Sequence, residues 1–131
     1  MYVLVMDTGD EVVASLTNFA KENNLYAASL SAIGAFSDTE LGYFDFAIKD
    51  YKKIIVREQV ELLSLTGDIT LYNNEPKLHA HVIVGKADGT AHGGHLLQAH
   101  VKPTLEVILT ELPAYLHREM DRKTGIPLIK L

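Results

Sequence analysis

The chain has 131 residues, of which 47% are hydrophobic and 22% charged. This is the composition of one globular domain with a sizeable core, so we expect a single domain over residues 1–131. There is no cysteine, which excludes disulfides, thiolate metal ligands and cysteine nucleophiles and makes a cytoplasmic location the expectation. The formal net charge is −5 and the 12 lysines and arginines are dispersed. Direct binding to nucleic-acid phosphates is therefore disfavoured, although a local basic patch on an oligomer stays open.

The N-terminal part of the sequence predicts a strand followed by one helix. Met1–Asp7 lacks the basic segment and cleavage site of a secretory signal and is predicted as a strand. Thr8-Gly9-Asp10-Glu11 has the form of a capping box, with Thr8 as the N-cap and Glu11 reaching back. The next apolar residues fall on one helical face: Val12, Leu16, Phe19 and Ala20. Asn23-Asn24 is the predicted end of the helix.

The rest of the chain is predicted to be mostly strands, and no apolar run is long enough to cross a membrane. The expected strands are Leu25–Ile33, Phe36–Phe46, Lys53–Arg57, Val60–Tyr72, Leu78–Val84, Thr90–Val101 and Thr104–Leu112. Gly67 is predicted to be a bulge or bend, and Asn73-Asn74-Glu75-Pro76 a turn. The tail from Tyr115 fits either a last hairpin or a short helix followed by a strand. The predicted fold class is α+β, an antiparallel β-sheet with one N-terminal helix packed on it.

Three histidines form the pattern that points to chemistry. In Leu78-His79-Ala80-His81-Val82 two histidines are separated by one residue, so on a strand both imidazoles lie on the same face. His95, in Gly93-Gly94-His95-Leu96, follows across a glycine-containing turn and can fold back against that pair. Three neutral imidazoles at one point make a transition-metal site, best suited to zinc, with one coordination position open.

The register of the hairpin at Ala87-Asp88-Gly89 decides whether these histidines meet. A two-residue turn at Asp88-Gly89 would place His95 on the opposite face from the His-x-His pair. A three-residue loop with Gly89 in the left-handed conformation would place His95 directly opposite His81, on the same face. We favour the three-residue loop, while a bulge at Gly93-Gly94 would also restore the register.

The same register excludes two other histidines from the cluster. His92 is expected opposite Val84 on the other face, and His100, five residues after His95, is expected to point the same way as His92. A structural interpretation also stays open, because two histidines at this spacing are more often ordinary strand residues than metal ligands.

Glu106 is the candidate catalytic residue, because it interrupts an otherwise almost fully apolar strand. It is either a solvent-facing position of an alternating strand or a carboxylate that orients a ligand imidazole or handles a metal-bound water. The sequence leaves open whether the protein is an enzyme.

Several segments together resemble one known family. They are Gly34-Ala35-Phe36-Ser37-Asp38-Thr39-Glu40-Leu41-Gly42-Tyr43, Glu61-Leu62-Leu63-Ser64-Leu65-Thr66-Gly67-Asp68-Ile69, the His-x-His segment, Asp88-Gly89, Gly93-Gly94-His95-Leu96 and Leu105-Glu106-Val107. In this order they resemble the PPC domain, the "plants and prokaryotes conserved" domain long classed as a domain of unknown function, in its stand-alone prokaryotic form without an AT-hook.

The resemblance implies an antiparallel sheet with a packed helix that assembles as a homotrimer. It also implies that His79, His81 and His95 match the family's metal-ligand histidines. Two functions follow as hypotheses. The first is a zinc or other divalent metal site that acts on or senses a small molecule. The second is a DNA-associated or transcription-regulatory module that works mainly through protein–protein assembly, since the acidic charge disfavours direct DNA contact.

Overall fold

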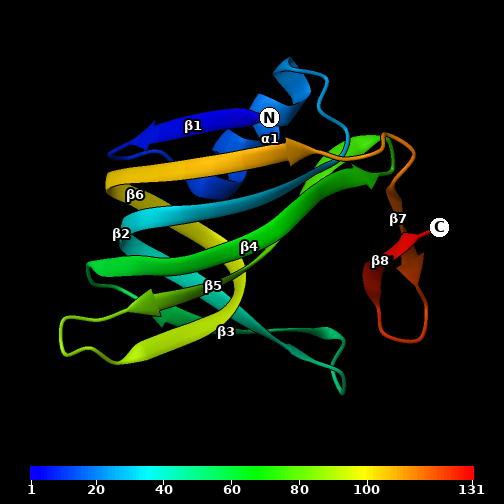
Figure 1. Cartoon of the computed structure of the whole chain (residues 1–131). Helices are drawn as coiled ribbons and strands as arrows, with labels where there is room; N and C mark the ends of the chain where they lie inside the picture. The colour runs from blue at the N-terminus through cyan, green and yellow to red at the C-terminus, as the bar shows by residue number, and fades with distance from the viewer.

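The computed structural model describes all 131 residues and confirms an α+β fold with one helix and eight strands (Figure 1). The helix is α1 (Val12–Glu22). The strands are β1 (Tyr2–Asp7), β2 (Ala28–Asp45), β3 (Asp50–Val56), β4 (Val60–Tyr72), β5 (Glu75–Gly85), β6 (Ala91–Glu111), β7 (His117–Asp121) and β8 (Ile126–Lys130). No helix has the length and apolar character needed to cross a membrane.

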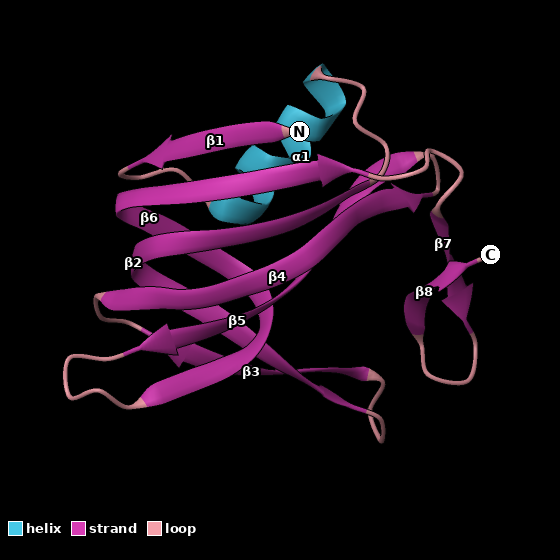
Figure 2. Cartoon of the chain, in the orientation of Figure 1, coloured by secondary structure: helices cyan, strands magenta, loops and turns pink.

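All eight strands belong to one sheet, in the order β3-β2-β6-β5-β4-β7-β8, with β1 paired to β6. Strand β2 also pairs with β4, so the pairings among β2, β6, β5 and β4 form a closed circuit. Every strand pairing is antiparallel except the short parallel contact between β4 and β7. Figure 2 shows α1 behind β1 and β6, and the β7–β8 hairpin at one side of the sheet.

The helix packs on the sheet through its predicted apolar face. Val12, Leu16 and Ala20 are fully buried and belong to a core cluster of 24 buried residues. Burial of a valine or leucine side chain stabilises a fold by about 1.5–3 kcal/mol each. Phe19 is partly buried, and its ring makes an edge contact with Tyr2 of β1 at a centroid distance of 5.3 Å. The helix ends at Glu22 with Asn23 as its C-cap, as predicted.

The start of the helix differs from the prediction, because the N-cap is Glu11 and not Thr8. Thr8 and Gly9 form a turn after β1, with Gly9 at φ +96°, and Gly9 and Asp10 form backbone hydrogen bonds with Val101 of β6. The helix therefore begins only after Glu11. The Glu11 carboxylate then accepts from the first free N–H groups of the helix, those of Val13 at 3.0 Å and Ala14 at 2.9 Å.

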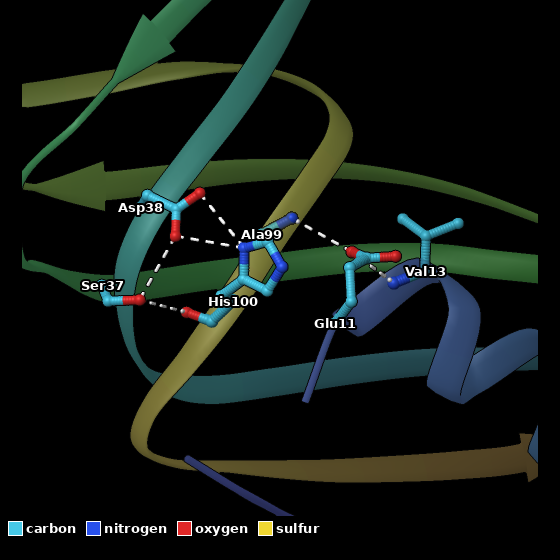
Figure 3. Close-up of polar contacts among 6 residues, drawn as sticks. All are labelled: Glu11, Val13, Ser37, Asp38, Ala99 and His100. Carbon is cyan, nitrogen blue, oxygen red and sulfur yellow. Dashed lines mark hydrogen bonds and ion pairs between the residues drawn. The ribbon is translucent and has the colours of Figure 1, made fainter. Parts of the chain in front are cut away.

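The same carboxylate ties the helix to the sheet. It accepts a third hydrogen bond, at 3.1 Å, from the backbone N–H of Ala99 in β6 (Figure 3). One side chain therefore caps α1 and also fixes the helix start to a strand 88 residues further along the chain.

Two pairs of predicted strands are single long strands in the structure. Leu25–Ile33 and Phe36–Phe46 correspond to the 18-residue β2, and Thr90–Val101 and Thr104–Leu112 to the 21-residue β6. The breaks expected between them are register shifts in the β2–β6 pairing, where extra residues bend a strand without ending it. The tail forms the hairpin of β7 and β8, which is one of its two predicted alternatives.

Gly67 is neither a bulge nor a bend, so that prediction is wrong. It pairs in regular register with Leu30 of β2 and Ala80 of β5, and the irregularity of β4 lies between Leu62 and Ser64. A Cβ atom at Gly67 would lie 2.8 Å from the Cα of Ala80. Glycine is therefore required here for close backbone approach.

Replacement of Glu11 by alanine should destabilise the protein by about 1–2 kcal/mol, because it leaves helix N–H groups without acceptors. Urea unfolding followed by circular dichroism measures the change. Glu22→Ala, at the exposed other end of the helix, is the matched control and should have a much smaller effect. Equal losses in the two variants would contradict the role assigned to Glu11.

Candidate metal centre

Strands β5 and β6 bring the three predicted histidines together on the outer face of the sheet. His79 and His81 flank the buried Ala80 on β5, and His81 pairs directly with His95 on β6. The ring centroids are 5.1 Å apart for His79 and His81, 5.2 Å for His79 and His95, and 5.8 Å for His81 and His95. One ring nitrogen of each lies within 4.8 Å of those of the other two. The three nitrogens are therefore close enough together to bind a single metal ion.

The three-residue loop produces this register. The backbone N–H of Lys86 donates to Thr90 at 2.9 Å, and that of Gly89 donates to Lys86 at 2.9 Å. Gly89 has φ +84°, the left-handed conformation that glycine adopts without steric cost. The loop prediction, and with it the pairing of His81 with His95, is confirmed.

Tyr51 of β3 packs against the His95 ring. Its ring stacks on the imidazole at a centroid distance of 4.5 Å and an interplanar angle of 26°, and its hydroxyl lies 3.4 Å from His95 Nδ1. A Cβ atom at Gly42 would lie 2.7 Å from the Tyr51 ring, so glycine at that position leaves room for the stack. Tyr51 stands in a charged run, Lys49–Lys53, and nothing in that run signals a role at the site.

Arg118 of β7 contacts His79 and is the second residue that the sequence did not reveal. Only 6% of its surface is exposed. Its Nη2 lies 2.9 and 3.0 Å from the two Asp68 oxygens and 3.2 Å from His79 Nδ1. Its Nε donates to Thr70 at 3.1 Å, and its Nη1 donates to the carbonyl oxygen of Pro127 at 3.1 Å. The guanidinium thus joins the C-terminal hairpin to the histidine cluster.

Burial and neighbouring groups lower the pKa of two of the three histidines. Burial, His79, His81 and Lys77 lower the pKa of His95 from 6.5 to about 4. Burial and the Arg118 guanidinium lower the pKa of His79, against an opposing effect of Asp68. Neutral imidazoles carry a free lone pair, which is the form that binds a metal.

Two hollows open beside the cluster. One of about 210 Å³ lies between His79, His95 and Tyr51 on one side and the hairpin residues Arg118 and Pro127 on the other. A second, polar hollow is lined by Thr66, Gly67, Asp68, His79 and His81. His79 lines both hollows, so each of them leads to the cluster.

The structure places His92 and His100 outside the cluster, as predicted, but the predicted direction of His100 is wrong. A register shift between Leu96 and Gln98 adds one residue to β6, and Ala99 and Val101 are both buried, so His100 points away from the core as His95 does. His92 pairs with Val84. The Nδ1 of His100 lies 3.1 and 3.2 Å from the two carboxylate oxygens of Asp38 on β2, which is itself 3.3 Å from the Ser37 hydroxyl (Figure 3).

Glu106 does not lie beside the histidines of its own chain. It is exposed on β6, opposite Val5 of β1 and Ile33 of β2. It lines a different hollow, together with Leu63 and Ile108. Of its two interpretations, the solvent-facing position fits the isolated chain.

The family model of the Plants and Prokaryotes Conserved (PCC) domain, also abbreviated PPC, matches residues 1–113. The chain belongs to this family. The predicted resemblance is thereby confirmed, and the matched range includes all three histidines. The β7–β8 hairpin with Arg118 lies after the end of the match.

Several solved structures share the fold over almost the whole chain. A PPC protein from Pyrococcus horikoshii is 33% identical with a TM-score of 0.94, and the superposition covers 99% of this chain and 90% of that one. A metal-containing protein from Archaeoglobus fulgidus is 35% identical with a TM-score of 0.90, covering 99% and 92%. A protein from Ralstonia eutropha, named as a candidate DNA-binding protein, is 30% identical with a TM-score of 0.93, covering 99% and 90%.

Curated relatives of this PCC chain are much longer proteins. The bifunctional protein GlmU of a Synechococcus species is 30% identical over 128 residues, which is 95% of this chain but 19% of the relative. The chain therefore spans about a fifth of the length of the curated relatives it matches.

The pKa of His95 makes the stability of the metal-free PCC chain depend on pH. Between the ordinary value of 6.5 and the folded value of about 4, the unfolded chain binds a proton at His95 that the folded chain does not bind. Stability should therefore fall as the pH is lowered through this window and level off below it. Urea unfolding at several pH values measures this.

The His95→Asn variant should show a shallower pH dependence in the same window, because it lacks the group whose pKa is lowered. His92→Asn is the control and should keep the slope of the unmodified protein. If His95→Asn and the unmodified protein have the same slope, the burial of His95 does not have the assigned effect.

Proposed function

We propose that this protein binds a divalent transition metal, with zinc as the best fit, through His79, His81 and His95. The observation that carries the proposal is the direct pairing of His81 with His95 beside His79, which gathers one nitrogen of each within 4.8 Å. Three imidazole nitrogen donors suit zinc and leave a coordination position open. The metal-containing relative from Archaeoglobus fulgidus supports the proposal.

The surroundings of the three histidines fit such a site. The His95 Nδ1 faces the Tyr51 hydroxyl, which leaves its Nε2 for an ion, and metal-binding histidines usually form a hydrogen bond through their second nitrogen. The adjacent hollow of about 210 Å³ is of a size for a small molecule. When bound, zinc supplies a Lewis acid that polarises a coordinated ligand. We propose that the site binds a small molecule at this position and either acts on it or senses it.

We further propose that copies of the chain cover the outer face of the sheet, in agreement with the homotrimer expected for the family. This face exposes a patch of apolar side chains on four strands: Val3 and Val5 of β1, Ile33 of β2, Leu63 of β4 and Ile108 of β6, each at least 47% exposed. Monomeric proteins rarely expose a contiguous patch of this kind, which is typical of an association surface.

The apolar patch continues towards the histidines. Thr66 lines both the hollow of the patch and the polar hollow beside His79 and His81. A copy seated on the patch would therefore lie next to the cluster. Glu106 lines the hollow of this patch, so any role of this carboxylate at a metal would be played from a neighbouring copy.

DNA association is the second candidate function, supported by relatives named as candidate DNA-binding proteins. The charge of this chain argues against direct contact, since it is −5 overall and DNA binding requires neutralisation of several phosphates by clustered cations. Association through a DNA-binding partner would suit the chain better.

Protein purified without added metal should contain about one zinc or related ion per chain, measured by elemental analysis. His79→Ala combined with His81→Ala should remove this ion, because a single remaining imidazole binds too weakly. The matched control is His92→Ala combined with His100→Ala, which should keep it. Equal metal content in the two double variants would refute the site.

Fluorescence anisotropy with duplex DNA separates the two functions. We expect no sub-micromolar binding by this chain at physiological salt. Tight binding with a salt dependence that indicates several phosphate contacts would favour the DNA-associated function instead.

A further inference from the structure

Arg118 and His79 form a contact that bears directly on whether His79 can bind a metal. The guanidinium is almost fully buried and belongs to the C-terminal hairpin, 39 residues after the histidine. Its Nη2 lies 3.2 Å from His79 Nδ1 and 2.9 Å from an oxygen of Asp68. One nitrogen with two hydrogens is therefore shared between an imidazole and a carboxylate.

The chemistry of the two groups fixes the position of the His79 proton. A guanidinium donates hydrogen bonds and accepts none, so His79 Nδ1 must be the acceptor. A neutral imidazole has one lone pair and one N–H group. With its lone pair directed at Arg118, His79 carries its proton on Nε2.

A metal ion at His79 also needs that single lone pair. If the ion binds Nε2, the proton moves to Nδ1, and Arg118 can no longer donate to that atom. If the ion binds Nδ1, it takes the acceptor of Arg118 directly. The hydrogen bond from Arg118 and a bond from His79 to a metal therefore exclude each other in a neutral imidazole.

Resting on the proposed metal site, we propose that Arg118 and Asp68 are positioning residues that set the metal-binding state of His79 in opposite directions. Arg118 holds the metal-free state by occupying Nδ1. Asp68 supports the metal-bound state by accepting a hydrogen bond from the protonated Nδ1, while Nε2 binds the ion. Metal ligands of this kind commonly donate their second N–H to a carboxylate.

The positions of the two residues permit the exchange. Asp68 on β4 pairs directly with His79 on β5, so the two side chains are neighbours on one face. Arg118 keeps its other partners, Thr70 and the carbonyl oxygen of Pro127, when it releases His79. The exchange thus requires a small shift of one Nη2 group rather than release of the hairpin.

The ¹⁵N chemical shifts of the histidine rings in unmodified, metal-free protein test the first half of the proposal. The expected result is a protonated Nε2 and an unprotonated Nδ1 at His79, assigned by comparison with His79→Gln. Zinc should move the proton to Nδ1. A proton on Nδ1 in the metal-free protein would overturn the proposal, and so would an unchanged tautomer in protein saturated with zinc at His79.

Zinc affinities of two variants test the second half. Arg118→Lys keeps the positive charge for Asp68 but removes the fork that reaches His79, and should tighten zinc binding about tenfold. Asp68→Asn removes the anionic acceptor and should weaken binding by about tenfold or more. Arg122→Lys, an exposed arginine of the same hairpin, is the control and should change nothing.

Opposite effects of the Arg118 and Asp68 variants on zinc affinity distinguish this role from a merely structural one. If Arg118 and Asp68 only anchor the hairpin, both variants loosen the site and both weaken zinc binding, which would overturn the proposal. Failure of the unmodified protein to bind zinc would overturn the proposed metal site, whereas a Nδ1 proton in the metal-free protein would overturn this inference and leave the metal site standing.

Discussion

The direct pairing of His81 with His95 is the constraint on which the site depends. Because side chains alternate along a strand, a slip of one residue between β5 and β6 would move His95 to the opposite face of the sheet. The three-residue loop at Ala87-Asp88-Gly89 prevents this slip, and Gly89 at φ +84° permits the loop. The identity of one turn residue therefore decides whether three imidazoles meet.

Local rules made this part of the molecule predictable from the sequence. The His-x-His spacing, the loop chemistry of Gly89 and the apolar helix face each involve residues close together in the chain, and each is confirmed. The capping prediction at Thr8 is wrong because it ignored a partner far along the chain, where Gly9 and Asp10 pair with Val101. That pairing holds the turn at Thr8 and Gly9 against β6, so the helix begins later than predicted and Glu11 is its N-cap.

The residues around the histidines were not predictable for the same reason. Tyr51 is 44 residues from His95, and Arg118 is 50 residues from Asp68. No periodicity or motif connects positions so far apart. An arginine in a charged tail is expected to lie on the surface, and only the pairing of β7 with β4 buries Arg118. Once the hairpin is packed, Arg118 is buried and contacts His79. In such a buried environment a hydrogen bond is stronger than in water, and a polar group without a partner destabilises the fold.

X-ray absorption spectroscopy of the zinc-loaded protein tests most directly whether His79, His81 and His95 bind the metal between Tyr51 and Arg118. The expected spectrum shows about three imidazole nitrogens at about 2.0–2.1 Å together with one oxygen ligand in the fourth position. A zinc shell made of oxygen ligands, without the multiple scattering of imidazole rings, would contradict it.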